Sequence, residues 1–168
     1  YVMFQALATG HGGMCTMHAD SADSAVKRLM QKPMNIPSSY IPLMNCVITV
    51  KRVMHKALLT QGGILSGTRR TTHVSEVLSE TNINNIFNWD SSSNIFNGDI
   101  KKSALFQKIA DNTGLSVEDI IEEFNRRVLI IQWMVDENIH DYKKVGSIVS
   151  AYYKNPEAMI RNITPIGV

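Results

Sequence analysis

The sequence predicts an α/β protein in which a mixed region of helices and strands is followed by a purely helical region. Segments with helical periodicity alternate with strand-like segments up to about residue 99, and only helical periodicity follows. The 168 residues are 44% hydrophobic and 19% charged, a globular composition that suits one medium domain or two small ones. We therefore expect two domains, residues 1–99 and residues 100–168.

The first three expected elements form an αβα unit. Residues 1–8 and 21–31 have helical patterns, and residues 14–18 between them alternate like a short buried strand. One face of this strand would carry Met14, Thr16 and His18. His18 would then lie at the carboxyl end of the strand, where open α/β sheets bind ligands. We therefore predict a functional site at His18.

Two other interpretations of His18 stay open. A histidine at this place can cap the following helix or hydrogen-bond a loop. The spacing of His11, Cys15 and His18 tolerates a metal ion, but a strand would turn Cys15 away from His18, and no second ligand pair follows. We therefore predict no metal site. Cys15 and Cys46 are isolated in segments expected to be buried, which indicates a reducing compartment without disulfides.

A short helix, two strands and a hairpin are expected to complete the first domain. Pro33 and Pro37 frame a loop, and Ser38 or Ser39 caps a helix that ends at Met44. Strands are expected at residues 46–54, at residues 71–79, and in a hairpin with its turn at residues 90–94. The aromatic residues of this hairpin are expected in the core.

Basic residues gather at the ends of two of these strands. One group lies at the end of the first strand and consists of Lys51, Arg52, His55 and Lys56. This group is either a solvated strand end or a patch that faces a neighbouring subunit. Arg69 and Arg70 precede the second strand, where they would stabilise phosphate charge across a subunit interface or form surface ion pairs. The net charge of +2 gives no strong case for nucleic acid or a membrane surface as the partner.

The second domain is expected to be a small helical bundle. Its first helix covers about residues 103–112 and ends at Gly114, and Ser116 caps a long second helix. The expected buried stripe of the long helix is Val117, Ile120, Ile121, Phe124, Val128, Ile131 and Val135. Helices at residues 141–153 and 156–162 complete the bundle.

Three separated blocks of the sequence resemble one protein family. Residues 4–13 (FQALATGHGG) and 16–21 (TMHADS) resemble the histidine box of the type II/type IV secretion-system ATPases. Residues 69–77 (RRTTHVSEV), 87–90 (FNWD) and 122–127 (EEFNRR) resemble the archaeal branch that drives archaellum and type IV pilus assembly. The resemblance extends through nearly all of the chain.

This resemblance implies a fold and a working context. Residues 1–99 would form the histidine-box half of a P-loop (RecA-like) ATPase domain with a small β-hairpin region, followed by an all-α C-terminal bundle. The family implies a homo-hexameric motor that hydrolyses ATP with Mg²⁺. It would be cytoplasmic, at the inner face of the cell membrane. Its partners would be a polytopic membrane platform protein and the pilin or archaellin assembly machinery, without direct contact to nucleic acid.

The same resemblance implies roles for particular residues. His18 corresponds to the box histidine near the terminal phosphate, where it would couple the nucleotide phosphate to movement. Nucleotide binding would involve the neighbouring residues of the box, which are His11, Gly12, Gly13 and Thr16. Arg69 and Arg70 would lie at the subunit interface.

One departure from the family is plain, because no Gly-x-x-x-x-Gly-Lys-[Ser/Thr] phosphate loop occurs in the chain. The acidic strand that the family places before the box is also missing, and the Mg²⁺ ligands are expected in such upstream elements. Residues 1–8 enter an apolar helix without a capping side chain. We therefore expect that the chain starts inside a domain and is inactive by itself.

Two further classes of function stay open. The chain can be a non-catalytic interaction module in which the bundle docks a membrane platform partner and the α/β part is scaffold. The missing phosphate loop favours that class. A nucleic-acid motor of related architecture would need a basic groove interleaved with aromatic residues, and no such stretch is visible in the sequence. No apolar run reaches the ~20 residues of a membrane span, so any membrane association is expected to go through a partner.

Overall fold

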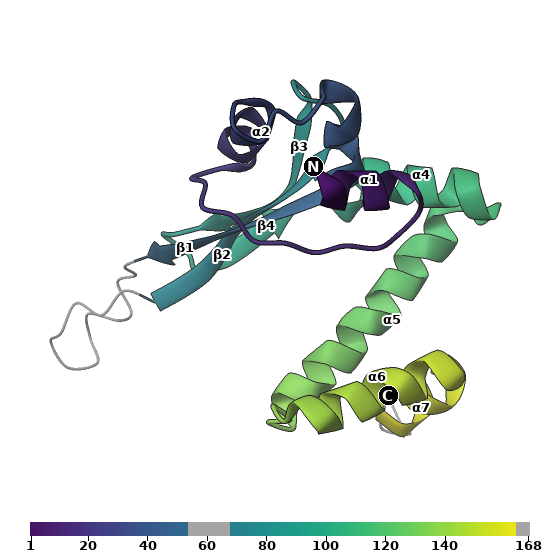
Figure 1. The fold of residues 1–168 in the computed structure, drawn as a ribbon. Helices are drawn as coiled ribbons and strands as arrows, with labels where there is room; N and C mark the ends of the chain where they lie inside the picture. Colours follow the sequence, from purple (N-terminus) through teal and green to yellow (C-terminus); the bar gives the residue numbers. More distant parts are fainter. Residues whose placement is uncertain (54–67, 164–168) are drawn as a thin grey trace, which may run out of the picture. The chain divides into compact units, whose positions relative to one another are not determined.

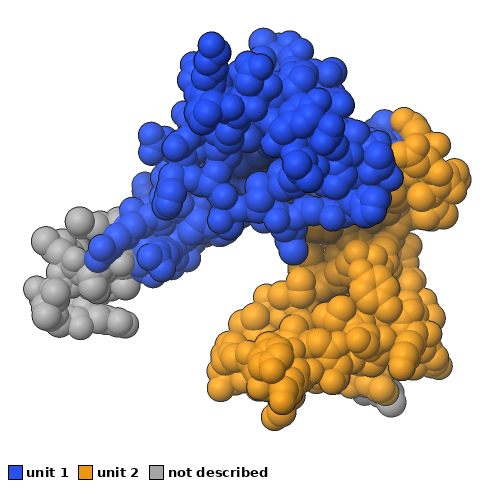
Figure 2. All heavy atoms as spheres, viewed as in Figure 1, with its two compact units in different colours: residues 1–108 blue, residues 109–168 orange. Residues whose placement is uncertain are grey.

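The computed structural model describes residues 1–53 and 68–163. The chain divides into two compact units, residues 1–108 and 109–168, which Figure 2 colours separately. Each unit is described here by itself. The assignment of functions to residues 1–99 and 100–168 stays a prediction. His55 and Lys56, which the sequence placed in a basic group, lie outside the described residues.

Short helices make up much of the first unit, and the predicted ones are confirmed. The predicted ones are α1 (Val2–Ala8), α2 (Ala22–Met30) and the 3₁₀ helix η1 (Ser38–Met44). The 3₁₀ turn η2 (Ile100–Lys102) was not predicted. Helix α2 starts as expected, because the Ser21 hydroxyl accepts a hydrogen bond from the Ser24 amide at 3.1 Å. The capping prediction for η1 was wrong, since η1 starts after Pro37 without a side-chain cap.

One antiparallel sheet forms the other layer of this unit (Figure 1). Its strands are β1 (Cys46–Val53), β2 (Thr68–Val77), β3 (Ile83–Asp90) and β4 (Ile95–Gly98), in the order β1-β2-β3-β4. The register shifts between Thr49 and Val50 in the first pair and between Val74 and Ser75 in the second. The fold is therefore α/β in content, and each described strand pair is antiparallel.

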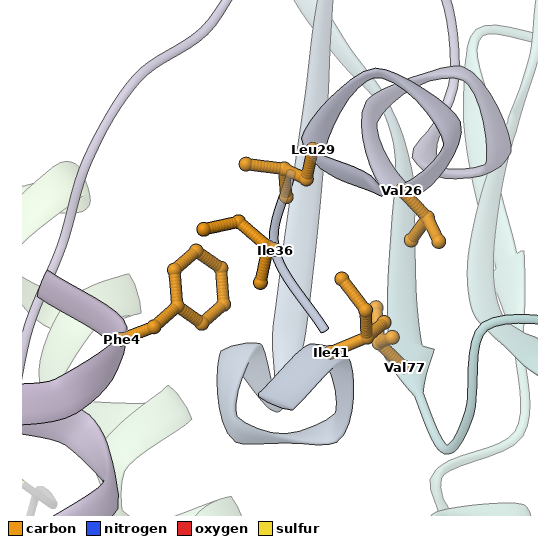
Figure 3. Close-up of a cluster of buried hydrophobic side chains, with 6 residues drawn as sticks. All are labelled: Phe4, Val26, Leu29, Ile36, Ile41 and Val77. Carbon is orange, nitrogen blue, oxygen red and sulfur yellow. The ribbon is translucent and has the colours of Figure 1, made fainter. Parts of the chain in front are cut away.

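The core of the first unit lies between this sheet and the helices. Six buried side chains form it, and Figure 3 shows them converging from α1, α2, the segment before η1, η1 itself and β2: Phe4, Val26, Leu29, Ile36, Ile41 and Val77. Val77 pairs with Ile83, and Val47 also packs against the cluster. One face of the sheet is thus covered near Val77. The same contacts hold α1 and α2 in place, the helices before and after residues 9–21.

The other face of the sheet holds the start of helix α4 (Ala104–Thr113) through one carboxylate. Glu76 of β2 is buried, and it accepts hydrogen bonds from the Ser103 hydroxyl, the Ala104 amide at 2.8 Å and the Leu105 amide at 3.4 Å. The Asn84 side-chain amide donates to the same carboxylate at 3.4 Å. A negative group at a helix amino terminus satisfies amides that have no partner within the helix. Glu76 therefore caps α4 from a strand.

The second unit is built around the long helix α5 (Val117–Asp136), followed by α6 (Tyr142–Lys154) and α7 (Pro156–Ile163). A capping box between Ser116 and Asp119 starts α5, and Gly114 precedes it with a φ of 73°, as a glycine after a helix end should have. The predicted helices of the bundle are confirmed.

The predicted buried face of α5 is confirmed at Ile120, which is buried, and Val117, Ile121 and Phe124 are half-buried. In the second half of the helix the prediction was wrong. Val128, Ile131 and Val135 are 45%, 57% and 58% exposed. Ile130 and Met134 are buried instead and form a cluster with Tyr152. At 100° per residue, Ile130 lies on the opposite side of the helix from Val128, so the side that meets α6 and α7 is a second apolar stripe. The Tyr152 hydroxyl donates to Glu123 at 2.8 Å and fastens α6 to α5.

The predicted turn at residues 90–94 is confirmed, and its hydrogen bonds favour the charged form of the Asp90 carboxyl. The Asp90 carboxylate accepts hydrogen bonds from the Ser93 hydroxyl at 2.7 Å and from the Ser92 amide and hydroxyl at 2.8 Å. These bonds favour the charged form and lower the pKa of Asp90 to about 2, with the Ser93 hydroxyl as the largest cause.

We expect the Asp90 carboxyl to titrate near pH 2 when followed by carbon NMR. Because this folded-state pKa is below the ordinary value of 3.8, the bonds favour the folded turn above about pH 4, and that contribution disappears as the pH falls through 2. Ser93→Ala should raise the pKa toward 3.8. Ser91→Ala is the matched control and should leave it unchanged, so equal titration curves for all three proteins would contradict this account.

Candidate functional site

The segment between α1 and α2 contains most of the predicted site residues, and we call residues 9–20 the box loop. Residues 11–19 have no regular secondary structure, and each residue of the loop is exposed. The predicted buried strand at residues 14–18 was therefore wrong. Gly10 has a φ of 89°, which favours glycine, and the loop contains two more glycines. Among the described residues, no strand pairs with residues 14–18, so their alternating pattern does not produce a strand.

The start of the box loop is tied to the end of α1. The Thr9 hydroxyl donates to the Ala6 carbonyl at 2.9 Å and lies 3.1 Å from Nδ1 of His11. The His11 amide also donates to the Ala6 carbonyl, at 3.1 Å. A Cβ atom added at Gly13 would lie 3.1 Å from Cδ2 of Leu7, so a side chain there would push on α1. His11 and Gly13 are thus placed beside α1, whereas Gly12 has open space around it.

The end of the box loop is tied to α2. The Arg28 guanidinium donates to the backbone carbonyl of His18 at 2.7 Å. The His18 ring is exposed and makes no hydrogen bond to another residue in the ranges that the structure describes. Thr16 is exposed two residues earlier. The backbone of His18 is therefore held by a helix while its ring is available to a ligand.

The two predicted arginines belong to a different part of the first unit. Arg69 and Arg70 lie within β2, which begins at Thr68, rather than before the strand as expected. In the register of the sheet, Arg70 is opposite Lys51 and Arg69 is opposite Arg52. His11, Gly12, Gly13, Thr16 and His18 thus lie along one exposed loop, and the arginines lie opposite residues of β1.

Two features of the residues around the arginines and the box loop were not predicted. Trp89 was expected in the core, but it is half-buried, with the Arg70 guanidinium 5.8 Å from the centre of its ring. Cys15 and Cys46 were expected in buried strands, and both are exposed free thiols. The buried strand expectation failed for Cys15 because its strand does not exist. It failed for Cys46 because Cys46 is exposed in β1, as Ile48 and Val50 are.

The donors of the box loop suit a phosphate group. Imidazole and hydroxyl groups of His11, Thr16 and His18 can donate hydrogen bonds to phosphate oxygens, and the glycines permit close approach of the backbone. Within residues 1–53 and 68–163, no cluster of three His, Cys, Asp or Glu side chains is arranged to hold a metal ion. In the same residues, no helix combines the length and apolar character needed to cross a bilayer.

No family model matches the chain. The uncharacterized protein MJ1287 of Methanocaldococcus jannaschii is 29% identical over 132 residues, which are 75% of this chain and 46% of that protein. The uncharacterized protein MJ0900 is 28% identical over 162 residues, 91% of this chain and 28% of that protein. The uncharacterized protein MJ0781 is 21% identical over 161 residues, 88% of this chain and 20% of that protein.

These three relatives come from one archaeal organism, and the chain spans less than half the length of each. The similarity therefore connects the chain with part of longer archaeal proteins.

Proposed function

We propose that this chain is the downstream part of an ATP-hydrolysing motor subunit that resembles the type II/type IV secretion-system ATPases, with His18 coupling the nucleotide phosphate to movement. The observation that carries the proposal is the box loop. Residues that resemble a histidine box form an exposed loop that two helices hold at its ends, and His18 presents an exposed ring from a fixed backbone position.

The contacts of His18 suggest how the loss of a bound phosphate would move other parts of the first unit. A ring that hydrogen-bonds a terminal phosphate would be released when that phosphate leaves. Because the His18 carbonyl is bonded to Arg28, a shift of the loop would pull on α2. Val26 and Leu29 of α2 belong to the same core cluster as Val77 of β2, so α2 would transmit the shift to the rest of the unit.

The proposal extends to the setting of the whole protein. Residues 1–99 would complete a RecA-like domain with an upstream half that supplies the phosphate loop, and ATP would supply the phosphoryl group. Mg²⁺ ligands would belong to that upstream half. A homo-hexamer at the cytoplasmic face of the membrane would then power archaellum or type IV pilus assembly, or secretion, with a polytopic platform protein as partner. Arg69 and Arg70 would face the neighbouring subunit.

ATP hydrolysis by a version extended upstream through a phosphate loop tests this proposal. We expect His18→Ala in that version to lower kcat about 100-fold, because a hydrogen bond to the reacting phosphate is lost, while ATP still binds. The matched control is His140→Ala, since His140 is also exposed but lies between α5 and α6. The 168-residue chain alone should be inactive. Hydrolysis by that chain, or a fully active His18→Ala variant, would refute the proposal.

A second candidate function is a non-catalytic interaction module, and the exposed stripe of α5 favours it. Val128, Ile131 and Val135 lie on one side of the helix, opposite its contacts with α6 and α7. Such a module would dock a membrane platform partner through the bundle. Ile131→Asp would then abolish binding of the platform protein, and a His18→Ala variant would bind it normally. If ATP hydrolysis occurs in the extended version and depends on His18, the motor is the correct function.

A further inference from the structure

The second half of the box loop has a single hydrogen bond to the rest of the first unit. The Arg28 guanidinium donates to the His18 carbonyl at 2.7 Å. Within residues 1–53 and 68–163, this is the one hydrogen bond that joins residues 12–19 to another segment. Figure 1 shows the loop running as a separate coil from the end of α1 to the start of α2. The backbone position of His18 therefore depends on this bond.

Arg28 can hold the loop because helix α2 is itself fixed. Val26 and Leu29, which come before and after Arg28 in the sequence, are buried in the core, and the Ser21 hydroxyl caps the helix. Arg28 lies about 10 Å along the helix axis from Ser21, and helical side chains lean toward the amino end of their helix. The guanidinium thus reaches back to the loop that precedes α2.

Without this bond, little in the loop restricts its conformation. Gly10, Gly12 and Gly13 precede Thr16 and His18, and glycine has the widest choice of backbone conformations. Each residue of the loop is exposed, so few packing contacts limit its motion. Loss of the bond would increase the number of positions that the His18 ring takes. A smaller fraction of the molecules would then hold the ring where it can contact a phosphate.

The bond and the His18 ring can be altered separately. Because the acceptor is a main-chain carbonyl, the bond does not require a histidine at position 18. Asp20 and Asp23 are close to Arg28 in the sequence, but neither forms an ion pair with it in the part of the chain that the structure describes. The carbonyl of residue 18 thus remains the acceptor when the ring is removed.

We propose that Arg28 is a positioning residue that sets the place of the His18 ring for contact with the terminal phosphate. Arg28 acts through the backbone of residue 18, so its effect on ATP hydrolysis disappears when the His18 ring is absent. This inference rests on the proposed function of His18. It deepens that function, because it assigns the precision of the phosphate contact to one guanidinium of α2.

Nitrogen NMR relaxation of the 168-residue chain tests the bond without any need for ATP hydrolysis. Arg28→Met removes every donor of the guanidinium but keeps an unbranched apolar side chain on an exposed position. We expect lower order parameters at the amides of Thr16 and His18 in this variant, because the loop is released. Lys27→Met is the matched control, since it removes the same charge from an exposed neighbour in the last turn of α2. Equal order parameters in all three proteins would overturn the proposal.

Kinetics of the upstream-extended version test the role in ATP hydrolysis. Arg28→Met should lower kcat about tenfold and leave KM for ATP unchanged, because a misplaced ring affects the reacting phosphate and not the binding of the nucleotide. Arg28→Lys should restore part of the rate, since an ammonium can still donate a hydrogen bond to the carbonyl. Lys27→Met should leave kcat unchanged. In a His18→Ala background, Arg28→Met should cause no further loss.

Failure of this inference is distinguishable from failure of the proposed function. A low kcat for His18→Ala beside a fully active Arg28→Met variant would overturn the inference alone. A further loss from Arg28→Met in the His18→Ala background would also overturn it, because Arg28 would then act on the nucleotide or on the fold and not through the ring. Equal losses in Lys27→Met and Arg28→Met would assign the effect to charge. A fully active His18→Ala variant would refute both.

Discussion

Ile41→Ala is expected to lower the free energy of unfolding of the first unit by about 4 kcal/mol. Ile41 is 0% exposed and meets Phe4, Val26 and Val77 in the core between helices and sheet (Figure 3). Its removal leaves a cavity whose walls come from separate elements and are fixed by their own packing. The cost therefore includes both the lost burial and the empty space.

Urea unfolding followed by tryptophan fluorescence measures this loss. Trp89 belongs to the first unit and Trp133 to the second, so a Trp133→Phe background makes the signal specific. The matched control is Ile48→Ala, because Ile48 is 62% exposed and should cost less than about 0.5 kcal/mol. Equal effects of Ile41→Ala and Ile48→Ala would show that the core is placed wrongly.

Glu76→Leu is expected to lower the free energy of unfolding by about 3 kcal/mol. The substitution keeps a side chain of similar volume, but it leaves the Ser103 hydroxyl and the amides of Ala104 and Leu105 without their acceptor. Glu76→Gln keeps one acceptor oxygen, so its loss should be about half as large. The first turn of α4 should also open more often, since its cap is gone.

Hydrogen exchange at the amides of Ala104 and Leu105 reports this opening directly. Both amides should exchange faster in Glu76→Leu than in the unchanged chain, and Glu80→Leu is the control because Glu80 is exposed in the turn after β2. Protection at these two amides that survives Glu76→Leu would mean that another group caps α4.

Local signals in the sequence were enough to predict the helices and the hairpin. Ser21 and Ser116 mark the starts of α2 and α5 because a hydroxyl before an apolar periodic stretch caps a helix. The turn after Asp90 was equally clear, since aspartate and serine side chains hydrogen-bond nearby backbone groups. Each of these predictions depends on residues within about four positions of one another.

Predictions that depended on tertiary contacts failed more often. The alternation at residues 14–18 suggested a buried strand, but a strand needs a neighbour that the short pattern cannot supply. Helix α5 carries two apolar stripes, and the sequence does not say which of them α6 and α7 will cover. The capping role of Glu76 was missed because its partners are nearly thirty residues away in the chain, between Ser103 and Leu105.

In the candidate site, too, the local features were predicted and the tertiary contacts were not. The residues of the box loop are neighbours in sequence, so the sequence placed His11, Gly12, Gly13, Thr16 and His18 together without any structure. Their backbone conformation was predicted wrongly. The pairing of Arg69 and Arg70 with residues of β1 became known only from the strand register, and the contact of Arg70 with the ring of Trp89 only from the folded structure.

The central claim is that His18 contacts the nucleotide phosphate, and a structure of the upstream-extended protein with a non-hydrolysable ATP analogue tests it most directly. The measured quantity is the distance between the nearest ring nitrogen of His18 and the terminal phosphate oxygens. Our account predicts about 3 Å, or about 5 Å with one bridging water, in at least one subunit. A ring more than about 10 Å from the phosphates in each nucleotide-bound subunit would contradict it, because no hydrogen bond spans that distance.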